Sequence, residues 1–245
     1  MTEKYVPENI SKNVALKSYL YRSPGEALEL YKSFEPELKG QMAEVYRQAF
    51  AGAPWFEKFR CNDCNRFFAT DSCCPECQGL NVREAYPTKD LIDNYFPKTL
   101  AEFTPGVLAT ASQNGSVIGF VIGGEITLEK LINKKYGGNS MIMESIVNNF
   151  SVRPESVLFY NNEFCVLPEK QNQGTGTSLA SAQLADVLKL EPEFVTGRTI
   201  NRSLLNIRKN GLKSAGYDFS YFVPNGDDFQ VNGTPRFFYL GKRMK

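Results

Sequence analysis

The stretch from residue 159 to residue 189 constrains the fold of this chain more than any other part of the sequence. It begins with a β-rich apolar run, 159–167, which Pro168 ends because proline cannot donate a hydrogen bond to a sheet ladder. A glycine-containing loop follows at 171–177, and a helical pattern of apolar residues then continues to Leu188. The stretch therefore predicts three consecutive elements: a strand, a loop and a helix.

The loop is suited to binding an anion. Gly174 and Gly176 precede a helix whose first turns carry hydroxyl groups and no acid before Asp186. The first N–H groups of a helix lack acceptors within the helix and form the positive end of its dipole. The loop and the helix start therefore predict a site for a phosphate or a pyrophosphate.

Known phosphate-binding motifs narrow the interpretation of this loop. No G-x-x-x-x-G-K-[ST] sequence occurs in the chain, and Leu179 stands where the dinucleotide motif G-x-G-x-x-G needs its third glycine. Gln171, Gly174 and Gly176 instead fit Q/R-x-x-G-x-G/A. Together with the strand exit VLPE at 166–169, this pattern resembles the acetyl-CoA loop of the GNAT acyltransferase superfamily. The alternative interpretation is an ordinary glycine turn between a strand and a helix.

The resemblance implies a complete fold. The elements predicted along the chain follow the GNAT order, β-α-(insert)-β-β-(insert)-β-α-β-α-β-β, over about residues 27–244. We therefore expect an α/β (α+β) fold with a mixed, mostly antiparallel central sheet, helices on both faces and a small inserted zinc ribbon. The expected parts are an N-terminal arm at 1–26 and an acyltransferase domain at 27–245, with a zinc-ribbon-like module at 57–87 and a helical insertion at 127–150.

Individual elements follow from periodicity and turn signals. Residues 27–34 are predicted as the first strand, and residues 37–50 as a helix because apolar side chains recur along one stripe. Asn114-Gly115 between two β-rich runs predicts a hairpin, and Gly137-Gly138 is predicted to split 127–150 into two amphipathic helical pieces. The longest apolar run, 117–124, is too short to cross a bilayer, and the N-terminus lacks the apolar core of a signal peptide. We therefore expect a cytoplasmic location.

Composition excludes several classes of function. The 245 residues include no histidine, which excludes His-based general catalysis, Ser/His and Cys/His pairs and metal sites that need imidazole. The net charge of +1 provides no global field that would recruit nucleic acid or an anionic membrane. We expect neither as a partner, and the sequence leaves homodimer formation open.

Four cysteines have the spacing of two zinc knuckles: Cys61, Cys64, Cys74 and Cys77. Four thiolates suit a closed, structural Zn²⁺ site, and a reducing compartment disfavours the alternative of disulfides. Cys73 could replace Cys74 in a C-x3-C variant, but the CPxC form favours Cys74. The sequence therefore predicts a metal crosslink that stabilises a long loop too small to have its own core.

The resemblance also implies a reaction and a cofactor site. In the GNAT superfamily an amine attacks the thioester of acetyl-CoA directly, in a ternary complex. A backbone N–H near Cys165 and Val166 would bind the thioester oxygen, and Asn201 would belong to a second cofactor segment. The loop residues that would hold the pyrophosphate are Gln171, Asn172, Gln173, Gly174, Thr175, Gly176 and Thr177. Leu212 departs from the family pattern, because many members have at this position a tyrosine that protonates the CoA thiolate. In this chain another hydroxyl or solvent would protonate the thiolate, or the reaction would need no dedicated acid.

The acceptor site needs a group that removes a proton from an ammonium ion. Without histidine this proton passes to a carboxylate, or to a water that a carboxylate orients. Glu163, an acid inside an apolar strand, is the first candidate. Glu125 is the second and could instead hold the charge of the acceptor; solvated strand-end carboxylates are the alternative for both. Trp55 is expected either to line the acceptor site or to pack in the core.

Two other classes of function stay open at this point. The chain could be a catalytically weak acyl-CoA-binding or regulatory module that uses the zinc ribbon and residues 127–150 as a partner surface. Leu212 favours this interpretation, whereas the loop glycines and Glu163 favour an enzyme. A nucleic-acid-directed enzyme has support only from the ribbon and the basic residues at 241–245. The identity of the amine acceptor is not indicated by the sequence.

Overall fold

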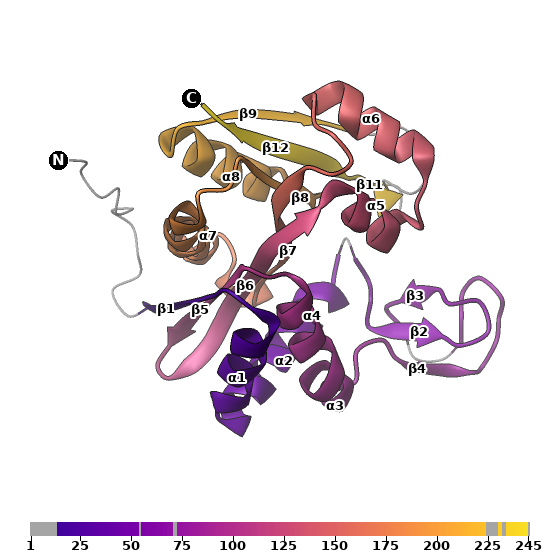
Figure 1. Cartoon of the computed structure of the whole chain (residues 1–245). Helices are drawn as coiled ribbons and strands as arrows, with labels where there is room; N and C mark the ends of the chain where they lie inside the picture. The colour runs from indigo at the N-terminus through magenta and orange to yellow at the C-terminus, as the bar shows by residue number, and fades with distance from the viewer. Residues whose placement is uncertain (1–13, 54, 71–72, 224–229, 232–233, 245) are drawn as a thin grey trace.

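A computed structural model describes residues 14–53, 55–70, 73–223, 230–231 and 234–244 (Figure 1). Its main feature is a seven-stranded sheet in the order β1-β5-β6-β7-β8-β12-β9. Every neighbouring pair is antiparallel except β7 and β8, which are parallel. The expected mixed, mostly antiparallel sheet is therefore confirmed. The strands are β1 (Val14–Tyr21), β5 (Gly106–Gln113), β6 (Ser116–Thr127), β7 (Val157–Val166), β8 (Phe194–Thr199), β9 (Tyr217–Phe222) and β12 (Phe237–Arg243).

Helices cover both faces of this sheet, as expected. Strand side chains alternate between the faces, so that Val195 packs with α7 and α8 whereas its neighbour Phe194 packs with α5 and α6. The helices α1, α2 and α4 pack against β5, β6 and β7 on the same face as α5 and α6. The helices are α1 (Pro24–Ser33), α2 (Pro36–Ala51), α3 (Thr88–Asp90), α4 (Phe96–Glu102), α5 (Leu128–Tyr136), α6 (Ser140–Phe150), α7 (Thr175–Val187) and α8 (Arg202–Ser214).

The prediction of a first strand at 27–34 was wrong, because these residues belong to α1. Ser23 accepts a hydrogen bond from the Glu26 N–H and Pro24 occupies the first helical turn, so both start signals of a helix are present. The first strand is β1, inside the segment predicted as an arm, and it pairs with β5 over its whole length. It lies at the edge of the sheet and is only partly buried, so its sequence lacks a clear alternation.

Two turn predictions agree with the structure. Asn114 and Gly115 join β5 to β6 with φ angles of 52° and 82°, the left-handed conformation that a tight hairpin requires. The segment predicted as two helical pieces forms α5 and α6, which separate at Gly137 in the left-handed conformation with φ 60°. Local turn chemistry was therefore sufficient to place both connections.

A second, three-stranded sheet lies apart from the main sheet, in the order β3-β2-β4 (Figure 1). Its strands are β2 (Phe59–Cys61), β3 (Phe67–Phe68) and β4 (Val82–Glu84). Cys61, Phe68 and Cys74 form its own small buried cluster. This module is inserted between α2 and α3, in the region where the cysteine pattern predicted a zinc ribbon. A short hairpin, β10 (Gln230–Val231) and β11 (Thr234–Pro235), precedes β12.

Among the described residues, no helix is both long enough and apolar enough to cross a membrane.

Candidate active site

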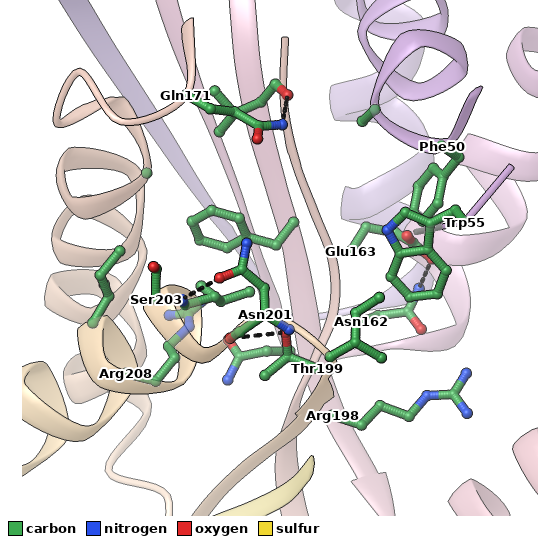
Figure 2. A pocket seen from close by; sticks show the side chains of 18 of the residues that line it. Phe50, Trp55, Asn162, Glu163, Gln171, Arg198, Thr199, Asn201, Ser203 and Arg208 are labelled. Atoms are coloured by element: carbon green, nitrogen blue, oxygen red, sulfur yellow. Dashed lines mark hydrogen bonds between the residues drawn. The ribbon is translucent and has the colours of Figure 1, made fainter. Parts of the chain in front are cut away.

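A cavity of about 880 Å³ opens where β7 and β8 separate (Figure 2). The two strands are paired only over Phe159–Asn161 and Val195–Gly197, although β7 continues to Val166. Residues from both faces of the sheet line the cavity, among them Glu163, Gly174 and Asn201. The gap between the strands therefore joins the face covered by α7 and α8 to the face covered by α2 and α5.

The start of α7 presents backbone N–H groups at one end of this cavity. Gly174 is the N-cap residue with φ 83°, and it makes no side-chain capping bond. The first helical bond runs from the Ser178 N–H to the Gly174 carbonyl at 3.0 Å, so the N–H groups of residues 175–177 have no acceptor in the helix. No acid stands in the first turn. This end of the cavity has the geometry and the charge that a phosphate needs.

The predicted cofactor loop lies only partly on the cavity wall. Five of its residues line the cavity, namely Gln171, Asn172, Gly174, Gly176 and Thr177. Gln173 instead donates its amide to the Glu169 carbonyl at 2.6 Å, and Thr175 is buried.

The edge of β7 presents a second backbone donor. The Leu167 N–H donates to Ile118 of β6 at 2.9 Å, so the alternation of an antiparallel ladder turns the N–H and carbonyl of Val166 toward the opposite side, where β8 has separated. The Gln171 side chain donates to the Val166 carbonyl at 3.1 Å, which leaves the Val166 N–H facing the cavity. The Cys165 side chain points away, into the core beneath α2.

The start of α8 forms the remaining wall on the α7 side. Asn201 caps this helix by accepting a hydrogen bond from the Leu204 N–H at 3.1 Å, and it lines the cavity as the predicted second cofactor segment should. Sequence analysis missed Arg208, which is buried, donates to Gln183 at 2.7 Å and lies 5.1 Å from the ring centre of Phe164. No local pattern distinguishes Arg208 from the other basic residues of α8.

Glu163 lies on the opposite side of the gap, and a β-bulge puts it there. Ile122 pairs with Glu163 whereas the next residue, Gly123, pairs with Asn161, so Asn162 is an extra residue in β7. The Glu163 carboxylate accepts hydrogen bonds from the Tyr95 hydroxyl and, at 3.0 Å, from the Asn162 side chain. Burial raises the pKa of Glu163 above its usual range, against the opposing effects of Lys135 and Tyr95.

Two tyrosines that sequence analysis missed support this carboxylate. Tyr46 of α2 lies 3.3 Å, oxygen to oxygen, from Tyr95, which ends a π-helical turn (Leu91–Tyr95), and both line the cavity. Burial raises the pKa of both hydroxyls well above the usual range, so both keep their protons at neutral pH. The apolar periodicity of α2 predicted Tyr46 only as a core residue.

Glu125 is not among the residues that line the cavity. It lies further along β6, where its N–H donates to the Pro105 carbonyl at 2.8 Å. Burial raises the pKa of its carboxyl group. The structure therefore brings Glu163, and not Glu125, to the gap between the strands.

Aromatic residues line the Glu163 side of the cavity. Trp55 contacts Phe50 with ring centres 5.2 Å apart, and the Arg236 guanidinium lies 5.4 Å from the centre of the Trp55 ring. The Tyr86 hydroxyl donates to Glu57. Glu57 precedes β2 and Tyr86 follows β4, so the two ends of the three-stranded module, where it joins the rest of the chain, form part of the cavity wall.

The four predicted zinc ligands come together in that module. The sulfur atoms of Cys61, Cys64, Cys74 and Cys77 all lie within 4.8 Å of one another, with Cys64 and Cys74 at 3.4 Å. Sulfur atoms around one tetrahedral zinc ion, with Zn–S bonds of about 2.3 Å, are separated by roughly 3.8 Å. Cys73 is turned away toward Gln78. The cluster therefore fits a single four-thiolate metal ion.

Solved structures with a similar arrangement share little sequence with this chain. One is the mosquito protein arylalkylamine N-acetyltransferase-like 5b. It is 10% identical to this chain with a TM-score of 0.49, and the match covers 94% of this chain and 100% of that one. The Salmonella typhimurium protein yncA, solved with its cofactor acetyl-CoA, is 11% identical with a TM-score of 0.45, over 94% and 95%. The Drosophila melanogaster polyamine N-acetyltransferase is 12% identical with a TM-score of 0.42, over 93% and 98%. No family model matches the chain, and no curated protein is similar to it in sequence.

The architecture itself defines the class of fold. A mixed, mostly antiparallel sheet with helices on both faces is the arrangement that the GNAT resemblance implies, and the glycine loop and the start of α7 follow β7 as that resemblance requires. The chain thus has the fold of the GNAT superfamily, here with a three-stranded cysteine module inserted between α2 and α3.

Proposed function

We propose that this protein is an N-acetyltransferase that transfers the acetyl group of acetyl-CoA to an amine. One observation carries the proposal: a single cavity connects the unpaired N–H groups at the start of α7 with the buried carboxylate of Glu163. A pyrophosphate bound at the first point and an amine held at the second would meet in the gap between β7 and β8.

The cofactor would lie along the α7 side of the cavity. The N–H groups at 175–177 would bind the pyrophosphate, and the pantetheine arm would follow the free edge of β7. The Val166 N–H, which faces the cavity, would donate to the thioester oxygen as negative charge develops there. Asn201 and Arg208 would contact the cofactor from α8.

The chemical step would be direct attack of the amine. The ammonium proton passes to Glu163, or to a water that Glu163 orients, and the free amine then attacks the carbonyl carbon. A C–N bond forms, which leaves the nitrogen of the tetrahedral intermediate with a second proton to lose. The C–S bond then breaks, and the CoA thiolate leaves and takes up that second proton, directly or through water. Glu163 is suited to the first part because its raised pKa makes it a stronger base than an ordinary carboxylate.

The cluster of four cysteines would hold a structural Zn²⁺. The four thiolates occupy the whole tetrahedral shell, so no position would be open for a substrate or water. The metal would therefore contribute stability to the inserted module, and through Glu57 and Tyr86 it would support the wall of the cavity.

A binding module without catalysis is the second candidate. Leu212 is a core residue and does not line the cavity, so a tyrosine acid is absent from that position. The observation that favours an enzyme is the buried carboxyl group of Glu163 in the cavity. Burial of this group is unfavourable and raises its pKa, and a module that only binds acyl-CoA does not need such a group.

The test is turnover. Purified protein should bind acetyl-CoA in a calorimetric titration and release thiol when an amine panel is added. Acetyl-CoA binding without thiol release from any amine would favour the binding module, and failure to bind acetyl-CoA would overturn both proposals.

A further inference from the structure

Three cationic side chains line the Glu163 side of the cavity: Lys135 of α5, Arg198 of β8 and Arg236, which directly precedes β12. Figure 2 shows Arg198 on the same side of the gap as Trp55 and Glu163, with Ser203 and Arg208 on the other side. Arg198 shares the strand face of Phe194, the face covered by α5 and α6. These cations are therefore separated by the sheet from the helix starts that suit the cofactor phosphates.

None of the ion pairs found among the described residues includes Lys135, Arg198 or Arg236. Each lies instead near an aromatic ring: Lys135 at 5.9 Å from Tyr160, Arg198 at 5.4 Å from Tyr136 and Arg236 at 5.4 Å from Trp55. The Nε atom of Arg236 is buried with no hydrogen-bond partner. Arg198 also interacts with the hydroxyls of Tyr136 and Tyr160, which are neutral groups, so among the described residues no carboxylate pairs with the charge of any of the three cations.

The carboxylates in the same half do not neutralise this charge. Glu57 and Glu163 are the only acids of the described chain that line the cavity, and both accept hydrogen bonds from tyrosines. Three cations face two carboxylates, and burial raises the pKa of both carboxyl groups, which favours their neutral forms. Burial and the neighbouring Arg198 lower the pKa of Lys135 to about 8. The acceptor half therefore carries an excess of partly buried positive charge.

Such an excess costs free energy unless a bound group compensates it. An arginine fork binds carboxylate or phosphate oxygens in a bidentate way, more specifically than an ammonium group does. A diamine would bring a further positive charge into this half and would be repelled. An amine that also carries an acid group would supply the missing anion.

We propose that the acceptor is a small amine that also bears an acid group, a carboxylate or a phosphate monoester. Arg198 and Arg236 would bind the acid group while the amino group lies at Glu163, and Trp55 and Phe50 would contact the carbon skeleton between them. The proposal rests on the proposed acetyl transfer, and it names the substrate class of that same site.

Matched acceptor pairs test it. Thiol release from acetyl-CoA would be measured with L-tyrosine and tyramine, L-arginine and agmatine, 4-aminobutyrate and butylamine, and O-phosphoethanolamine and ethanolamine. In at least one pair the acid-bearing member should have a kcat/KM about tenfold to a hundredfold higher, the scale of a charge-assisted hydrogen bond pair. The last pair separates a phosphate from a carboxylate as the recognised group. Equal or faster turnover of the plain amine in every pair would overturn the proposal.

Substitutions test which residues bind the acid group of the acceptor. Arg198→Met and Arg236→Met should each remove most of the preference by raising KM for the acid-bearing member, with the acetyl-CoA Kd unchanged. Arg198→Lys, which keeps the charge but loses the fork, should retain part of it. Arg153→Met, at an exposed arginine paired with Glu155, is the matched control and should behave as wild type. A preference that survives both methionine variants would overturn the assignment to these two arginines.

A binding experiment separates this proposal from the proposed function. The same pairs would be titrated calorimetrically into protein saturated with CoA. Acid-dependent binding that is lost in Arg198→Met, without turnover of any amine, would refute acetyl transfer and support the anion site. Turnover without a preference for acid-bearing amines would support acetyl transfer and refute the anion site. Absence of both acid-dependent binding and acid-dependent turnover would refute the anion site.

Discussion

Glu163 combines two environments that act in opposite directions on its proton. The Tyr95 and Asn162 donors favour the carboxylate, whereas burial favours the neutral acid and is the larger effect, so its pKa is raised. A base with a raised pKa accepts a proton more readily, but it is ionised only at a higher pH. The acid limb of the pH profile of kcat should therefore lie above the usual range for glutamate.

The first prediction concerns this base. Glu163→Gln should leave the acetyl-CoA Kd nearly unchanged, because the loop at 171–177 lies on the other side of the gap, and should lower kcat by about a hundredfold or more. The loss should shrink as the pH rises, because more of the amine then arrives neutral. Steady-state rates between pH 6 and pH 10 check this, with Glu129→Gln on the exposed face of α5 as the control. A wild-type kcat for Glu163→Gln at neutral pH would remove Glu163 as the base and make Glu125 the next residue to test.

The same substitution should stabilise the protein at neutral pH. The pKa of Glu163 is higher in the folded than in the unfolded chain, so its contribution to stability is present at low pH and is lost as the pH rises through the folded-state pKa. Glutamine does not titrate and still offers Oε1 to Tyr95 and Asn162. The Tm of Glu163→Gln should equal that of wild type near pH 4 and exceed it near pH 7, by about 2–4 °C for each kcal/mol gained. A lower Tm at pH 7 would contradict the direction of the pKa shift.

At the scale of elements, the start of α7 and the cysteine module each form one end of the cavity. The α7 start offers N–H groups and no acid, and the module supplies Glu57 and Tyr86 from its two ends. Changes in these two elements should therefore separate the two substrates kinetically.

The third prediction tests the α7 start. Gly174→Asp and Gly176→Asp should each weaken acetyl-CoA binding at least tenfold, because a negative charge would stand where the pyrophosphate binds. A Cβ at Gly176 would meet the Phe164 ring at 3.6 Å and the Ile207 side chain at 3.9 Å, both ordinary contacts, so the fold should tolerate this substitution. Gly176→Ala is thus the control for bulk and should bind within a fewfold of wild type. Unchanged affinity in both aspartate variants would refute the loop assignment.

The fourth prediction concerns the module. Protein purified without chelator should contain one zinc ion per chain, and serine at position 61, 64, 74 or 77 should lose it and lower the Tm. Cys73→Ser should keep the metal because Cys73 faces Gln78. Loss of the metal should raise the acceptor KM more than the acetyl-CoA Kd, because Glu57 and Tyr86 at the two ends of the module line the acceptor half of the cavity. Metal analysis combined with the two titrations checks this, and a metal-free native protein would contradict it.

At the scale of the whole molecule, the sheet would separate the two proposed substrates and let them meet at one gap. The helix starts of α7 and α8 lie on one face, whereas Glu163, Trp55 and Arg198 reach the cavity on the other (Figure 2). Each substrate can then enter without displacing the other. This arrangement favours a ternary complex over an acetyl-enzyme intermediate.

The fifth prediction follows from that arrangement. Double-reciprocal plots of initial rates should intersect, and Cys165→Ser should remain active within about tenfold of wild type. Cys165, the one cysteine of β7, is fully buried, and burial raises the pKa of its thiol well above the usual range, so it is a poor nucleophile. Parallel lines together with an inactive Cys165→Ser enzyme would indicate a covalent intermediate.

Local signals in the sequence located much of this molecule. The elements β7 and α7, the β5–β6 hairpin and the cysteine cluster each depend on residues close in the chain: Pro168, the loop glycines, Asn114-Gly115 and two C-x2-C pairs. They were predictable because turn geometry, helix starts and metal-ligand spacing are short-range properties. The position of Glu163 on the cavity wall was predictable for a related reason, since an acid inside an apolar strand is unusual.

The rest was decided by contacts between distant segments. The edge strand β1 acquires its identity only from pairing with β5, and 27–34 is helical because Ser23 and Pro24 start a helix there. Tyr95, Arg198 and Arg236 come from three separate segments of the chain, and nothing in their neighbouring sequence predicts that they share a cavity. The sequence by itself determined the glycine loop before α7, the cluster of four cysteines and the acid within β7, which are the candidates for anion site, metal site and base. Only the tertiary structure decided which charges surround that base, because burial and the proximity of charges are properties of the packed sheet and not of the chain.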